Sequence, residues 1–156
     1  MIWAAVFVWG CSTPYRPAKG GKGYTDSQIS TNEFQVGFQG NDRTHLEDVY
    51  DFALLRSAEI SLQHGRAYFA VIDVKNTSSA KSYMYHQRYY AVTPMDSGFG
   101  APTPSGYLID VQGKQTVFQP GTLLLIRTFA EKPSKPFTYD AAELRVALRK
   151  KHNLAH

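Results

Sequence analysis

The chain has 156 residues, of which 43% are hydrophobic and 19% are charged. This balance is typical of a globular protein and excludes a largely disordered or multi-span membrane chain. The length fits one domain with its own core and is too short for two. The formal net charge of +4 is mild, so we expect most of the basic side chains to be simply solvated. A single cysteine excludes an intrachain disulfide.

The chain opens with an uncharged apolar run, residues 1–10, which ends directly before Cys11. Ten residues of helix span about 15 Å, half of a hydrocarbon core, so the run is too short for a transmembrane helix. Its length is that of the apolar core of a secretory signal peptide. Val8, Gly10 and Cys11 resemble a lipobox, the signal of bacterial lipoproteins, in which an aliphatic and a small residue precede cysteine.

The resemblance implies cleavage before Cys11, a diacylglycerol on its sulfur and a further, palmitate-type acyl chain on its new amine. Two or more chains make membrane attachment stable where one is marginal. Ser12 is not the aspartate associated with inner-membrane retention, so the resemblance implies the outer membrane. Trp9 stands where small residues are usual, and a start further upstream would supply the basic leader of a signal peptide. The alternative is a buried strand with Cys11 as a small core residue.

The segment after the cysteine argues for an anchor. Residues 12–23 mix Pro, Gly and basic residues without an apolar period, which is typical of a solvated, semi-extended linker. We therefore expect a signal peptide over 1–10, a lipidated N-terminus and flexible tether over 11–31, and a single α+β domain over 32–156.

Three elements are predicted early in the domain. In 33–39 apolar residues alternate with polar or small ones, which predicts a strand with one buried face. A helix is predicted over 44–64, because Thr44 and Glu47 have capping-box spacing and apolar residues recur at helical intervals. A strand over 66–74 follows, with apolar residues on both faces, as expected inside a sheet.

The later elements complete the fold class. We predict an aromatic strand over 83–92, a loop over 93–105, and strands over 106–111, 115–119 and 122–130. A turn is expected at Gly113-Lys114, and Asp140 should cap a last helix, with Glu143 three residues on. The expected fold is α+β: a mixed, mostly antiparallel sheet of four to five strands with two helices packed on one face, after the lipidated tether.

A second resemblance rests on several short segments before Val74. They are Gly10–Tyr15, Gly23–Tyr24, Phe34–Asn41, Ala53–Glu59, Gly65 and Tyr68–Phe69. In these segments the chain resembles a group of small, uncharacterised envelope lipoproteins of Gram-negative bacteria. The resemblance implies a lipoprotein and brings no catalytic activity with it.

The motifs of common enzyme families are missing from the sequence. It has no Gly-x-Ser-x-Gly, no His-Glu-x-x-His, no phosphate-binding glycine loop and no paired-cysteine metal site. We expect a protein that is not an enzyme, with no cofactor or metal and only a covalent lipid on Cys11. A hydrolase is the less favoured alternative, assembled for example from Ser57, His64 and Asp73.

The best candidate binding surface is an aromatic cluster of Tyr83, Tyr85, Arg88 and Tyr89. Tyrosine offers a flat apolar face with a polar tip, and neighbouring donors would suit a glycan or a peptide. The alternative is that these rings pack into the core, as aromatic stripes commonly do.

A second candidate is a buried charge pair around Asp73, which interrupts an apolar strand. A buried carboxylate must be paired or protonated, and such groups often mark sites. Arg56 and Arg127 are its expected partners. The alternative is a strand-end carboxylate with a local partner.

Together these observations predict a lipid-anchored, periplasm-facing protein of the outer membrane with a structural or interaction role. Its expected partners are the lipid bilayer, through the acyl chains, and peptidoglycan or an envelope protein. An exported protein would rarely meet nucleic acid, so none is expected. The alternative function is a glycan- or peptidoglycan-binding module that uses the tyrosine cluster.

Overall fold

A computed structural model of the chain describes residues 12–93 and 105–155. They form two compact units. The sheet unit holds the described residues up to 79 and from 118 onward, and the hairpin unit holds those between 80 and 117. Within the expected domain over 32–156, residues 80–117 thus form a compact unit of their own.

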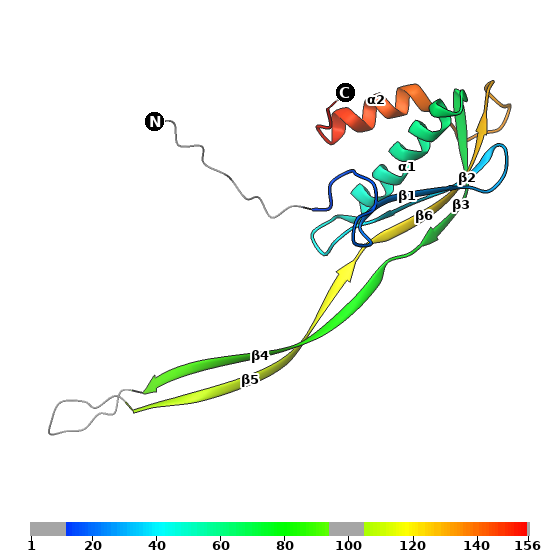
Figure 1. Ribbon diagram of the computed structural model, residues 1–156. Helices are drawn as coiled ribbons and strands as arrows, with labels where there is room; N and C mark the ends of the chain where they lie inside the picture. Colours follow the sequence, from blue (N-terminus) through cyan, green and yellow to red (C-terminus); the bar gives the residue numbers. More distant parts are fainter. Residues whose placement is uncertain (1–11, 94–104, 156) are drawn as a thin grey trace, which may run out of the picture. The chain divides into compact units, whose positions relative to one another are not determined.

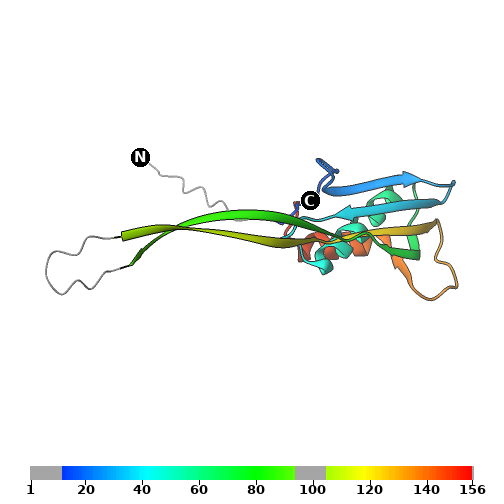
Figure 2. The same ribbon diagram turned by 90° about the horizontal axis from the view of Figure 1, so that it is seen from below.

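The sheet unit contains five strands and two helices. They are β1 (Gly23–Gln28), β2 (Glu33–Gln39), α1 (Leu46–Gln63), β3 (Tyr68–Asn76), β6 (Gly121–Phe129), β7 (Thr138–Asp140) and α2 (Ala141–Lys151). The strand order is β1-β2-β6-β3-β7, and all neighbouring pairs are antiparallel. Both helices cover the same face of the sheet (Figures 1 and 2). The predicted α+β fold with two helices on one face is confirmed.

The core lies between α1 and the sheet. Phe34, Val36 and Phe38 of β2 are buried, because alternate residues of a strand point to the same face. They meet the apolar stripe of α1, in which Val49 and Leu55 are fully buried. Burial of such side chains contributes roughly 1.5–3 kcal/mol each.

The two helix starts differ from each other. Asp140 caps α2 as predicted, since its side chain accepts a hydrogen bond from the Glu143 N–H at 3.0 Å. The predicted capping box of α1 is wrong, because its N-cap is His45, which makes no side-chain cap. Thr44 is committed elsewhere: its Oγ1 accepts from the Thr13 N–H at 3.0 Å.

The expected tether over 11–31 is wrong for most of its length. Thr13 is buried, and Tyr15 packs against Tyr24 and Phe52 with ring centroids 4.9 and 5.6 Å apart. A turn with left-handed glycines at Gly20 and Gly21 leads into β1. The composition suggested a linker because single aromatic anchors leave no apolar period.

The hairpin unit is built from β4 (Ser79–Thr93) and β5 (Ser105–Gln119), which form a separate two-stranded sheet. The predicted strand over 83–92 lies within β4. The turn predicted at Gly113 is wrong, because β5 runs straight through it. Gly113 serves a close approach instead, since a Cβ there would overlap the ring of Tyr85. Most of the loop predicted over 93–105 falls outside the described residues.

Candidate binding surface

Three cross-strand contacts define the faces of the β4–β5 hairpin. Ser82 Oγ lies 3.1 Å from Thr116 Oγ1, and Arg88 Nε lies 3.9 Å from Asp110 Oδ2. The ring of Tyr85 lies over Gly113 in the same register. Because successive side chains of a strand alternate between faces, Tyr85 lies on the face opposite to Ser82 and Arg88.

Most described side chains of the hairpin unit are exposed, and Val117 is half-buried. Tyr83 is 51% exposed, Tyr85 40% and Met84 67%. None of the residues in 80–88 and 110–117 is buried. Tyr83 and Tyr85 share one face because they are two positions apart. The alternative that these two rings are core residues is therefore wrong.

A shallow hollow adjoins this tyrosine face. It has a volume of about 470 Å³ and is lined by Tyr85, Gln87, Lys114 and Gln115. The lining combines an aromatic ring, two amides and an ammonium group, so it can stack on an apolar surface while donating and accepting hydrogen bonds. This chemistry suits a polar ligand with a flat face.

The structure separates the other members of the predicted cluster. Arg88 pairs with Asp110 on the opposite face, where both side chains are well exposed. Such exposed pairs contribute about 0–1 kcal/mol. Tyr89 lies in β4, but its side chain falls outside the described residues. The predicted lipidation site, Cys11, also lies outside them.

The predicted buried charge pair is not formed. Asp73 is exposed beside a β-bulge in β3, and its carboxylate accepts from the Val74 N–H at 2.9 Å. Arg56 donates to Asp26 at 2.8 Å, and Arg127 donates to Glu33 at 3.0 Å. Sequence reasoning missed the bulge, which turns Asp73 away from the core.

The predicted hydrolase residues also have separate, local roles. Ser57 is fully buried in α1, where its hydroxyl donates to the carbonyl of Ala53 at 2.8 Å. The ring of His64 packs against Phe34 at the end of the helix, with centroids 4.7 Å apart. Both side chains therefore stabilise the fold through local contacts.

Sequence reasoning missed a cluster that joins the N-terminal segment to both helices. Its centre is Glu59, whose carboxylate accepts from the Tyr15 hydroxyl and, at 2.7 Å, from Arg149 Nη2. Burial, followed by this hydrogen bond to an anion, raises the pKa of Tyr15 far above its ordinary value. Tyr15 had been assigned to the linker, so no sequence signal marked it.

His152, which follows the last turn of α2, contacts α1. Its Nε2 lies 2.8 Å from Asp51 Oδ2, and its ring packs on Phe52 with centroids 4.7 Å apart. Lys151 Nζ reaches the same Asp51 oxygen at 2.7 Å. These contacts fix the end of α2 against α1.

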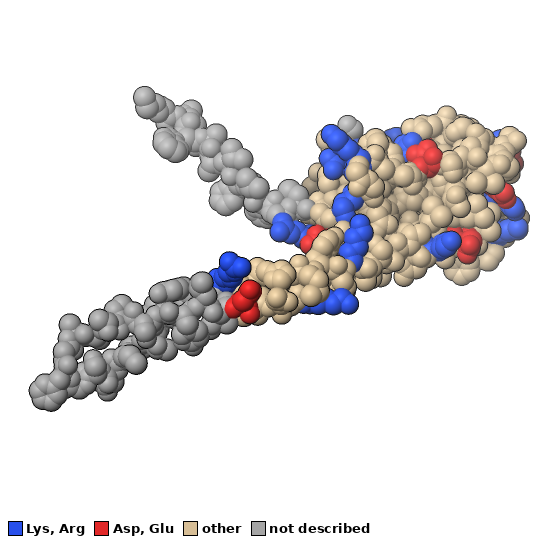
Figure 3. All heavy atoms as spheres, turned by 60° about the horizontal axis from the view of Figure 1, so that its bottom comes forward, with Lys and Arg blue, Asp and Glu red and all other residues tan. Residues whose placement is uncertain are grey.

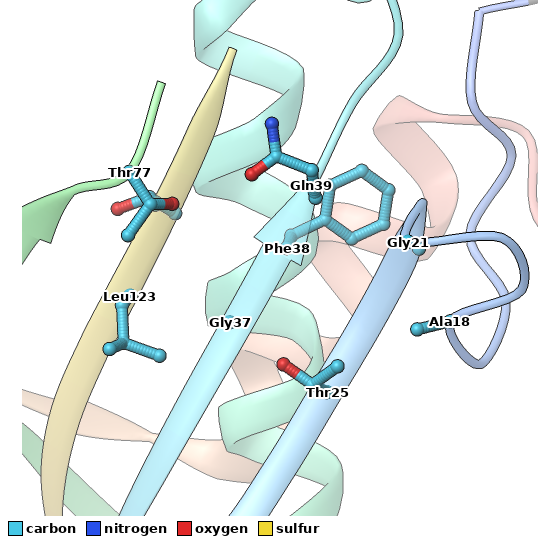
Figure 4. A pocket seen from close by; sticks show the side chains of 10 residues that line it. Ala18, Gly21, Thr25, Gly37, Phe38, Gln39, Thr77 and Leu123 are labelled. Atoms are coloured by element: carbon cyan, nitrogen blue, oxygen red, sulfur yellow. The ribbon is translucent and has the colours of Figure 1, made fainter. Parts of the chain in front are cut away.

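A small pocket of about 210 Å³ lies over β1, β2 and β6. Figure 4 shows Thr25, Gly37 and Leu123 side by side on these three strands. A Cβ at Gly37 would come within 2.9 Å of Thr25 Oγ1, so the glycine lets the neighbouring side chain settle over β2. Gln39, at the rim, donates to the carbonyls of Gln119 and Pro120. The side chains of Thr25 and Gln39 at this pocket thus make contacts within the sheet unit.

The charged side chains of the described residues form no single large patch on the face that Figure 3 displays. Figure 3 shows Lys and Arg in small, separate groups with Asp and Glu among them on the face it displays. Within the described residues, no three His, Cys, Asp or Glu side chains are placed to share a metal ion. No helix among them has the length and apolarity to cross a membrane. Comparison of the chain with protein-family models, curated proteins and solved structures finds no match.

Proposed function

We propose that this chain is an envelope lipoprotein, anchored through Cys11 in the outer membrane, whose hairpin binds another component of the envelope. The observation that carries the binding role is the exposure of Tyr83, Met84 and Tyr85 on the β4–β5 hairpin. Tyr and Met are enriched at protein interfaces, because they offer large contact area.

The stability of two-stranded sheets supports this role. A two-stranded ribbon is marginally stable by itself in water, and none of the described hairpin residues is fully buried. A partner that covers the tyrosine face would remove Tyr83 and Tyr85 from water and stabilise the ribbon at the same time.

The anchor rests on the lipobox-like end of the apolar run and on Ser12. Its test is the intact mass of the N-terminal peptide from native membranes, from the gene with its upstream DNA. We expect a peptide that begins at Cys11 and carries acyl chains, and none from Cys11→Ser. An unmodified chain that retains residues 1–10 in the cytosol would refute the anchor.

The binding role is tested by photo-crosslinking in cells. A photoreactive phenylalanine would replace Tyr83 or Tyr85, with Phe137 as the matched control because it is an exposed aromatic residue of the sheet unit. We expect one reproducible product from the two hairpin positions and none from Phe137. Equal patterns at all three positions would show that the hairpin has no special role.

Peptidoglycan is a second candidate partner, favoured by the hollow beside Tyr85. Sugar rings stack on aromatic faces, and Gln87, Lys114 and Gln115 would supply hydrogen bonds to hydroxyl and acetamido groups. The test is co-sedimentation of the purified protein with sacculi. Tyr85→Ala should reduce binding, whereas Arg88→Ala, on the opposite face, should not. Equal binding by both variants would exclude this surface.

A further inference from the structure

An apolar hollow lies in the sheet unit, beside the first turn of α1. Its volume is about 420 Å³, and its apolar lining comes from Leu46, Tyr50 and Val74. Leu46 is 56% exposed and Val74 is 51% exposed. The aliphatic side chains of Leu46 and Val74 thus both line this hollow and are exposed to solvent.

The N-terminal segment is fixed close to this hollow. Thr13 is 3% exposed and donates its N–H to Thr44 Oγ1 at 3.0 Å. Thr44 precedes Leu46 by two residues and packs on Gly40. The N–H of Gly40 donates to the carbonyl of Pro120 at 2.8 Å, and the next residue, Gly121, lines the hollow.

The remaining link to the proposed anchor is very short. Only Ser12 separates Thr13 from Cys11, and an extended chain advances at most about 3.6 Å per residue, or roughly 7 Å here. Acyl chains on Cys11 would therefore enter the membrane within a short distance of Thr44. The sheet unit cannot move far from the bilayer while Thr13 stays bound.

The polar rim of the hollow also fits a lipid surface. Arg43 is exposed and precedes Leu46 by three residues, and basic groups near a bilayer are attracted to anionic headgroups. Glu47, the acid in its lining, is paired with Lys151 Nζ at 2.6 Å. Apolar side chains with basic neighbours are typical of surfaces that lie in the membrane interface.

We infer that Leu46, Tyr50 and Val74, with the exposed Arg43 three residues before Leu46, form a bilayer-facing surface that rests on the membrane holding the anchor. The inference rests on the proposed acylation of Cys11. Acylation alone would not orient the domain, because a long, flexible tether would let any of its faces turn toward the lipid. The short link between Cys11 and Thr13 is what selects this surface.

Site-directed spin labelling tests the inference on the mature lipoprotein in phosphatidylethanolamine–phosphatidylglycerol vesicles. Acylation blocks Cys11, so only an introduced cysteine reacts with the nitroxide. The test variants are Leu46→Cys and Val74→Cys. The controls are Ile29→Cys and Val146→Cys, because both side chains are 55% exposed. Ile29 follows β1 directly, at the sheet end opposite to the Gln39–Gly121 pair.

We expect the labels at 46 and 74 to gain collisions with oxygen, which concentrates in bilayers, and to lose collisions with a water-soluble nickel complex. The labels at 29 and 146 should behave as in the unlipidated Cys11→Ser protein. Acylated protein with all four labels in water would overturn the inference and leave the anchor intact. Labels at 46 and 74 shielded from both reagents would overturn it too, because protein would then cover the hollow. An N-terminal peptide without acyl chains would overturn the anchor itself.

A longer link provides the matched control. A Gly-Ser insert of about ten residues between Ser12 and Thr13 has a root-mean-square span of roughly 17 Å. We expect it to preserve acylation while the label at 46 returns to water-like collision rates. Retention of lipid contact despite the insert would show that the short link does not orient the domain.

Discussion

The hydroxyl of Tyr15 donates a hydrogen bond to Glu59 Oε2, while Arg149 Nη2 donates to Glu59 Oε1 at 2.7 Å. One carboxylate of α1 thus holds both the N-terminal segment and α2. Hydrogen bonds to charged groups contribute about 1.5–3 kcal/mol each. The ends of the described chain are therefore tied to the same point of the core.

We predict that Tyr15→Phe lowers the free energy of unfolding by about 1–3 kcal/mol, because it removes a partly buried hydrogen bond to a carboxylate. Urea denaturation measures this. Tyr83→Phe is the control, since that side chain is exposed and its change should cost less than about 0.5 kcal/mol. Equal losses would mean that the Tyr15–Glu59 bond adds no stability.

Alkaline pH should weaken the native state through the same tyrosine. The pKa of Tyr15 is raised in the folded protein, chiefly by burial. The folded state therefore keeps a proton that the unfolded chain loses above pH about 10. The contribution of Tyr15 to the free energy of unfolding should be constant below that pH and fall above it. In Tyr15→Phe the fall should be shallower, and identical pH profiles of unfolding would contradict this origin.

Asp51 should be a strong contributor to the packing of α2. Its carboxylate contacts Lys151 at 2.7 Å and His152 at 2.8 Å, so Asp51→Asn removes one charge from two contacts. We expect a loss of about 1–3 kcal/mol at neutral pH, measured by thermal or urea unfolding. Asp48→Asn is the matched control on α1, because Asp48 lies 3.9 Å from His152. A larger loss at Asp48 would refute the assignment.

Gly113 should not tolerate a side chain while Tyr85 is present. A Cβ at Gly113 would overlap the Tyr85 ring, so Gly113→Ala should displace the ring and change its NMR chemical shifts. Tyr85→Ala should relieve the overlap, so that Gly113→Ala costs less in that background. Strictly additive effects on hairpin order would show that the ring does not lie over the glycine.

Thr44→Val should release the N-terminal segment. Thr44 Oγ1 accepts from the N–H groups of Thr13 and Asn41, and the change leaves both without this acceptor, at a cost of about 1–3 kcal/mol. Trypsin should then cleave after Lys19 and Lys22 faster than in the native protein. Thr25→Val, at an exposed position on β1, is the control. Unchanged cleavage in Thr44→Val would mean that this bond does not hold the segment.

The sequence predicted those helices and strands in which buried apolar residues recur at regular intervals. Phe34, Val36 and Phe38 alternate along β2, and Asp140 with Glu143 marks the start of α2. β1 gave no such signal, because its sequence, GYTDSQ, has one large apolar side chain, Tyr24. An edge strand with a short buried stretch does not produce a period.

The candidate site was predictable in its residue types and not in its geometry. The aromatic strand was visible around Tyr83 and Tyr85, but exposure depends on what covers a strand, which pattern alone does not determine. Gly113 indicated a turn because glycine usually does. Its contact with Tyr85 is a cross-strand effect, as is the bulge that exposes Asp73.

The N-terminal segment also affects how readily two copies of the protein could pair through their sheet edges. The Tyr24 N–H donates to the carbonyl of Arg16, and the Tyr24 carbonyl accepts from Ala18. This occupies part of the β1 edge, where Pro17 has no N–H to offer. The other edge strand, β7, has only three residues. Both borders of the five-stranded sheet are thus poor templates for strand pairing between molecules, which disfavours edge-to-edge aggregation.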